Sequence, residues 1–162
     1  MAQVDYYLKI PPIEGESADH KHKGEMEVES FSWGETRSAG AGGSSGVATG
    51  KVHSQEFQFL KRLDKSSPVL MIGCATGQQF KSAVLTGRKT GAGRDDYLRI
   101  TMENVSITSY HVGAAPGDDL PMDQVSLTFT TLEMSYKEQK PDGSLGAETK
   151  EKFDFATGSP QT

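Results

Sequence analysis

Residues 56–77, EFQFLKRLDKSSPVLMIGCATG, contain the one helix that the sequence predicts. Pro68 suits the first turn of a helix, where its missing N–H would have no partner, and Ser66 or Ser67 can cap the exposed amides. Gly77 can take the left-handed conformation that ends a helix. We therefore expect an element of about 8 to 10 residues, which is too short to be stable in water without packing.

The predicted helix is apolar on almost every side. This pattern predicts burial on most sides, against the chain's own sheet or against another subunit. Gly73 adds a place where another backbone can approach closely. Cys74 is the single cysteine, so an internal disulfide is excluded, and its place in the helix indicates a packed thiol. The apolar residues are Val69, Leu70, Met71, Ile72, Cys74 and Ala75.

The composition describes a single globular domain over residues 1–162. The chain has 35% hydrophobic residues and a mean hydropathy of -0.52, typical of a protein with a core and a polar surface. A net charge of -5, with no cluster of Lys and Arg among aromatics, argues against nucleic acid as a partner. No apolar stretch reaches the roughly 20 residues of a membrane span, and residues 1–12 lack the features of a signal peptide. We therefore expect folding in the cytoplasm without membrane insertion.

Strands account for most of the remaining chain. Two of them change the parity of their apolar positions once, near Asn104 and near Thr130, and such slips indicate β-bulges that bend a sheet toward closure. The predicted fold class is mostly β: a small antiparallel β-barrel with one short flanking α-helix and a long extended loop. The expected strands are 5–10, 26–33, 53–61, 79–88, 97–112, 125–136 and 150–155.

The long loop runs from Gly34 to Gly50 and is rich in Gly, Ser and Ala. Loops of this length within a compact domain are usually functional or disordered. Its end, residues 45–52, approaches a phosphate-binding P-loop. Ser45 replaces the first glycine, however, Val52 replaces the magnesium-binding hydroxyl, and a strand follows where a helix is required, so we reject that interpretation.

The sequence has no pattern that indicates catalysis, a metal site or a cofactor. Two histidines, His20 and His22, lie two residues apart in a polar loop, but no second ligand pair accompanies them, so a hydrogen-bonded loop is favoured. The pairs at 95–96 and 118–119 are turn aspartates, which cap backbone amides. His53 and His111 fall within expected strands without an obvious partner. We therefore predict no catalytic residues, no cofactor and no metal.

Three linked blocks of sequence carry a resemblance to a known family. Together they cover nearly the whole chain, and they closely resemble Hcp, the haemolysin-coregulated tube-protein family of bacterial type VI secretion systems. Two departures, Gly87 inside a strand and Ala114-Ala115-Pro116 in a turn, put only local loop geometry in doubt. The blocks are residues 15–34 (GESADHKHKGEMEVESFSWG), 57–70 (FQFLKRLDKSSPVL) and 97–127, the last with YLRITMENV and GDDLPMDQVSL.

The resemblance implies a structural subunit of the inner tube, in which six copies form a ring around a channel and rings stack. A contractile sheath and a spike protein would be partners, and effectors would travel in the channel. It also implies secretion without a signal peptide, to the extracellular space or a target cell. By this resemblance we expect ring or ring-to-ring contacts at six positions: Ser38, Gly42, Gly46, Val69, Leu70 and Ile72.

Three other functions remain open from the residues. A stand-alone barrel that binds a small molecule is one, although small barrels usually fill their interior with side chains. The related phage-type tail-tube protein is another. A hydrolase would need measurable turnover that depends on Asp118 or His111.

Overall fold

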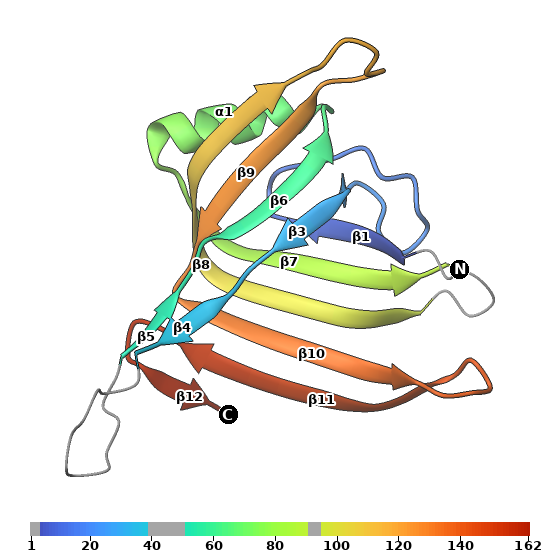
Figure 1. Ribbon diagram of the computed structural model, residues 1–162, viewed down its shortest axis with the longest axis vertical. Helices are drawn as coiled ribbons and strands as arrows, with labels where there is room; N and C mark the ends of the chain where they lie inside the picture. Colours follow the sequence, from blue (N-terminus) through green and yellow to red (C-terminus); the bar gives the residue numbers. More distant parts are fainter. Residues whose placement is uncertain (1–3, 39–50, 91–94) are drawn as a thin grey trace.

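Antiparallel strands and one helix make up the described part of the chain, which is residues 4–38, 51–90 and 95–162 of a computed structural model (Figure 1). All the strand pairs are antiparallel. The elements are β1 (Val4–Lys9), β2 (Met26–Val28), β3 (Ser30–Ser32), β4 (Glu35–Arg37), β5 (Val52–Ser54), β6 (Phe57–Arg62), α1 (Ser67–Thr76), β7 (Gln79–Lys89), β8 (Asp96–Gly113), β9 (Met122–Thr128), β10 (Thr131–Gln139), β11 (Leu145–Asp154) and β12 (Ser159–Gln161).

The long strand β8 organises the sheet. It pairs with β7 along one side, while on the other side its second half pairs with β9 and its first half with β10. In Figure 1 the strands β10, β11 and β12 lie at one end of the molecule and α1 at the other. β8 therefore connects the region around the helix to the C-terminal strands.

The two predicted parity slips lie opposite each other. Asn104 has a positive φ of 55°, and its side-chain amide donates to the Thr130 hydroxyl at 2.9 Å. The expected strand 125–136 is divided there into β9 and β10, and the Thr130 amide donates to the Glu103 carbonyl at 3.0 Å. The apolar pattern correctly located both irregularities, but neither is one extra residue. At Asn104 the backbone of the continuous strand β8 has a left-handed φ, and at Thr130 the chain breaks between β9 and β10. A true bulge in β8 lies nearby, where the β8–β9 register shifts between Ile107 and Ser109.

The remaining strands complete a barrel-like arrangement. β1 pairs with β7 and β2, whereas β6 pairs with β9 and β3. The expected strand 26–33 is divided at Glu29, whose amide donates to the Leu60 carbonyl at 2.8 Å. The change of apolar face within it thus marks a change of partner, from β1 to β6. No hydrogen-bonded ladder in the described residues joins β2 and β3. The ring of strands is therefore completed at this point by the chain itself, as it passes from β2 to β3.

Apolar side chains fill the interior between the strands. Phe57, Met102, Val105 and Leu127 come from three strands, β6, β8 and β9, and each is fully buried. Close packing of this kind is the main source of stability in a small β domain. Gly87, unexpected inside a strand, has a packing reason: a Cβ there would lie 3.2–3.3 Å from atoms of Leu98, Tyr6 and Tyr97.

Several expected boundaries differ from the structure. The strand expected at 53–61 is two strands, because Gln55 and Glu56 separate β5 from β6. β5 instead forms a hairpin with β4, at the two ends of the Gly34–Gly50 loop. The last of the expected strands is β11, which begins at Leu145, five residues before the expected start at Lys150, because it follows β10 along most of its length. The short strand β12 follows it. The centre of the long loop lies outside the described residues.

Candidate interaction surface around helix α1

Helix α1 forms where the sequence predicts it and spans Ser67–Thr76. Gly77 ends it with a left-handed φ of 65°, and Pro68 lies in the first turn. The expected side-chain cap is absent, since neither serine hydroxyl bonds a helix amide. The Ser66 hydroxyl donates to Asp64 and the Ser67 hydroxyl donates to Asp123, so both are used to bind carboxylates.

A buried ion cluster anchors the start of the helix. The Lys61 ammonium lies 2.8 Å from a carboxylate oxygen of Asp123 and 2.9 Å from one of Asp64, and both Lys61 and Asp123 are fully buried. It also donates to the Ser67 hydroxyl at 3.1 Å. Buried charges are tolerated when each is paired and hydrogen-bonded, and both conditions hold here. The cluster thereby joins β6, β9 and α1 at one point.

Tyr110 of β8 completes this cluster from the outer side. Its hydroxyl donates to the second carboxylate oxygen of Asp123 at 2.7 Å. Burial and this hydrogen bond raise the pKa of Tyr110 to about 12, so the phenol stays protonated at physiological pH. Asp123 therefore receives donors from three side chains, and the floor of the region beside α1 is rigid.

The helix buries one face and exposes the other. Leu70 is fully buried, and Gly73 faces the sheet, where a Cβ would lie 3.1 Å from the side chain of Ile107. On the outer face Val69 is 43% exposed and Ile72 51% exposed. The expectation of burial on most sides is therefore not met within one chain. Exposed contiguous apolar surface is typical of a contact with another protein.

An apolar groove of about 610 Å³ lies beside the exposed face of α1. Helix residues form one wall, and the end of β8 with the segment before the helix forms the other. Several of these side chains are large and exposed, with Met71 at 52% and Val112 at 58%. We call the groove together with the outer face of the helix the α1 surface. Its groove is lined chiefly by Leu63, Pro68, Met71, Cys74, Tyr110 and Val112.

The six interface positions predicted from the sequence fall into three groups. Val69 and Ile72 lie on the α1 surface. Leu70 does not, because its side chain points into the chain's own core, so its expected place in an interface is corrected. Ser38 is exposed just after β4, and Gly42 and Gly46 lie outside the described residues.

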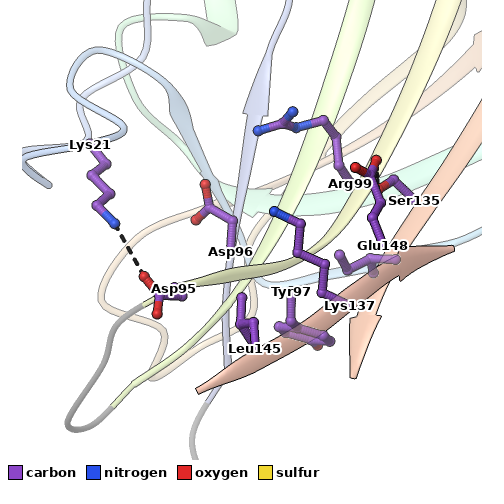
Figure 2. Close-up of a pocket in the computed structure, with 10 residues that line it drawn as sticks. Lys21, Asp95, Asp96, Tyr97, Arg99, Ser135, Lys137, Leu145 and Glu148 are labelled. Atoms are coloured by element: carbon purple, nitrogen blue, oxygen red, sulfur yellow. Dashed lines mark hydrogen bonds and ion pairs between the residues drawn. The ribbon is translucent and has the colours of Figure 1, made fainter. Parts of the chain in front are cut away.

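A second, polar groove of about 370 Å³ lies between the start of β8 and the strands β10 and β11 (Figure 2). Lys21 reaches across its rim to Asp95 at 3.5 Å. Figure 2 places Arg99 and Lys137 on the same groove as Glu148, so positive and negative groups alternate along it. This mixture gives the groove no strong preference for one sign of charge.

Of the candidates for chemistry, the structure brings together only His22 and Asp96 among the described residues. In the described residues no group of three or more His, Cys, Asp or Glu side chains is placed to hold a metal ion. His53 and His111 are both exposed on separate strands. His22 is buried and hydrogen-bonded to Glu25 and Asp96, which confirms the hydrogen-bonded loop. The residues that are described include no helix long and apolar enough to cross a membrane.

Sequence reasoning missed two polar clusters. Lys61 and Asp123 lie in different strands, and no local pattern connects them. Part of the His22 site could have been found, since Glu25 follows at a spacing of three residues. Its second partner, Asp96, comes from a distant strand and depends on the fold.

The comparison with known proteins decides the family. The family described as "Type VI secretion system effector, Hcp" matches residues 7–136. The chain belongs to the Hcp family. It is 37% identical to Protein hcp1 of Pseudomonas aeruginosa over 142 residues, which cover 87% of this chain and 88% of that protein.

Solved Hcp structures share the fold. A type six secretion system protein superposes with a TM-score of 0.93 at 26% identity, covering 98% of this chain and all of the other. Hcp1 of Salmonella typhimurium superposes with a TM-score of 0.83 at 30% identity, covering 99% of this chain and 100% of that one. The family expected from the three sequence blocks is therefore confirmed, as is the mostly β fold.

Proposed function

We propose that this chain is the subunit of a type VI secretion tube, in which six copies close into a ring and rings stack into a hollow tube. The observation that carries the proposal is the α1 surface. A single chain leaves this apolar helix face and groove open to water, although its own core is complete. In a ring closed by head-to-tail contacts, each subunit covers the α1 surface of one neighbour with a different part of its own surface.

The long glycine-rich loop is assigned to the contact between rings. Ser38 leads into it from the exposed β4–β5 hairpin. Small residues such as Gly42 and Gly46 permit close backbone approach between two rings. The sheath, the spike protein and effectors are the further partners, by membership of the family. The protein is then cytoplasmic before assembly and secreted afterwards.

Two alternatives fit the structure less well. A ligand inside the barrel would compete with the side chains of Phe57, Met102 and Leu127, which are fully buried there. An enzyme would need convergent polar groups in a cleft, whereas the groove beside α1 is mainly apolar and the polar residues at its floor are engaged with one another. We therefore assign no catalytic role to the chain.

The test of the ring is the mass of the particle in solution. Wild-type protein at micromolar concentration is expected to scatter light as six chains, each of 17.5 kDa, and to appear as rings in negative stain. Val69→Asp combined with Ile72→Asp places two carboxylates on the α1 surface and is expected to give single chains with a wild-type circular dichroism spectrum. Ala18→Asp, an exposed change in another loop, should leave the ring intact.

Two outcomes would count against the proposal. One is a wild-type protein that remains at 17.5 kDa over the whole micromolar range. The other is a doubly substituted protein that still forms six-membered rings, which would remove the α1 surface from the interface. Stacking is tested separately with Gly42→Asp and Gly46→Asp, which should leave ring mass unchanged and shorten or abolish tubes.

A further inference from the structure

The segment Ile13–Glu25 is folded back on itself and fixed to three other elements. Within the segment, the Gly15 amide donates to the Gly24 carbonyl at 2.8 Å and the Gly24 amide to the Ser17 carbonyl at 2.9 Å. Asp19, Glu16 and His22 of this segment attach it to its surroundings. We call residues 13–25 the strap.

Two of these ties hold the strap to β7 and to the entry of α1. Asp19 forms an ion pair with Arg88, a residue that is almost completely buried. At the other end of the strap, the Glu16 carboxylate accepts a hydrogen bond of 2.6 Å from the amide of Lys65, two residues before α1. The strap thus contacts the segment that leads into the α1 surface.

The third tie is His22, whose two ring nitrogens both face carboxylates. Nδ1 lies 2.8 Å from Glu25 in the strap, and Nε2 lies 2.9 Å from Asp96 at the start of β8. The ring is stacked on Tyr7 of β1 with centroids 4.6 Å apart and planes inclined by 8°, and the residue is only 6% exposed. A neutral imidazole has one N–H, whereas the imidazolium can donate to both carboxylates at once.

The neighbouring Asp19 and Tyr7 do not supply the second proton that a neutral His22 ring lacks. Asp19 is engaged by Arg88, and burial, which raises the pKa of Asp19, is outweighed by hydrogen bonds from the Lys21 amide and Arg88, so that this pKa is lowered. Burial and nearby carboxylates raise the pKa of Tyr7 to about 12, so the ring stacked on His22 is neutral.

Burial alone would lower the pKa of His22, but the hydrogen bonds to Asp96 and Glu25 outweigh it and raise that pKa above its ordinary value. Lys21, whose side chain lies half-exposed against Asp95, is the remaining cation of the strap beside this site.

We propose that His22 is a proton-operated clamp that fastens the strap to β8 when the imidazole is charged and releases one of the two attachments when it is neutral. The consequence reaches two surfaces. Lys21 and Asp95, which meet across the rim of the polar groove in Figure 2, come from the strap and from the start of β8. Glu16 lies in the same strap and accepts a hydrogen bond from the Lys65 amide, so loosening of the strap also reaches the segment before α1. This inference goes beyond the proposed function and does not depend on ring formation.

The direction of the pH dependence follows from the raised pKa. Because the folded value lies above the unfolded one, the clamp contributes its full stability below the ordinary histidine pKa of about 6.5. That contribution is lost as pH rises through the folded pKa. The clamp is thus fastened below the ordinary histidine pKa and loosened once the pH exceeds the raised pKa of His22.

The experiment is hydrogen–deuterium exchange by mass spectrometry on the wild-type chain between about pH 5.5 and about pH 8.5, corrected for the intrinsic exchange rate. Peptides from residues 13–25 are expected to lose protection as pH rises, while peptides from β8 around Val105 stay unchanged. His22→Gln should give low strap protection at every pH. His20→Gln, an exposed histidine in the same strap, should behave as wild type.

A second measurement keeps the proposal testable if His22→Gln does not fold. Deuterium exchange at the imidazole C2–H of each histidine in wild-type protein reports its titration directly. His22 is expected to titrate above the ordinary histidine pKa of about 6.5, and Asp96→Asn should lower its pKa. Strap protection independent of pH, or a His22 that titrates at or below the ordinary histidine pKa of about 6.5, would overturn the clamp.

Discussion

Removing the buried cation of the α1 anchor tests the stability argument most directly. Lys61→Met keeps much of the apolar stem but deletes the ammonium, which lies 2.8 Å from Asp123. Asp123 has no exposed surface and would be left as a buried charge held only by two hydroxyl donors, from Ser67 and Tyr110. Breaking a buried pair from one side typically costs about 3–5 kcal/mol, and we expect a loss in that range.

The neighbouring position provides a matched control. Arg62→Met removes a cation from the next residue of β6, but its guanidinium pairs with Glu29 at the surface, where the two side chains are 61% and 50% exposed. Exposed pairs contribute about 0–1 kcal/mol. Lys61→Met should therefore destabilise the protein by several times as much as Arg62→Met.

Chemical denaturation of the three proteins at one matched concentration is the assay, because the stability of an assembling protein depends on concentration. Adding Asp123→Asn to Lys61→Met removes the orphaned charge and should recover part of the loss. A free energy of unfolding for Lys61→Met within about 1 kcal/mol of the value for Arg62→Met would refute the reasoning. Removing one partner of a buried ion pair should destabilise the protein by more than that.

Two further predictions concern positions where the chain has no spare room. Leu70→Asp would bury a carboxylate without a partner and should cost several kcal/mol, so that both fold and ring are lost. Val69→Asp, on the exposed face of the helix, should keep the circular dichroism spectrum of a folded chain. Intact rings of Leu70→Asp would contradict this. Gly15→Ala would place a Cβ 2.5 Å from the Glu25 carbonyl oxygen and should lower the melting temperature. Gly24→Asn meets no neighbouring atom and has only the strain of its φ of 79°, which asparagine tolerates better than most residues, so it should lower the melting temperature less. Thermal melts that rank the two in the opposite order would refute the packing argument.

Local chemistry explains why the helix could be predicted. Pro68 and Gly77 influence only the backbone within a few residues of each. Helix α1 begins and ends at the positions that these two residues predict. The parity slips at Asn104 and Thr130 were visible for the same reason, because apolar alternation is a local record of which face is buried. What alternation does not record is the partner of each strand, so it could not show that β9 and β10 are separate.

The polar contacts of the site could not be predicted in this way. Lys61 meets Asp123, and His22 meets Asp96, only after distant strands have paired. The exposure of Val69 and the burial of Leu70 also depend on how α1 is rotated against β8, and a helix that is apolar on all sides gives no periodic signal for that rotation. Membership of the family could be recognised because it rests on linear order within three blocks.

The pairing of distant strands also sets a constraint on synthesis. β8 pairs with the strands directly before and after it, β7 and β9, and β10 pairs with β11. In contrast, β1 must wait for β7, with Val4 opposite Lys89, and β6 must wait for β9, with Phe57 opposite Leu127. Distant contacts of this kind slow folding and leave early segments unpaired. β1 and β6 therefore leave the ribosome before these partners exist, and the barrel can first assemble only when the chain has been translated well past its midpoint.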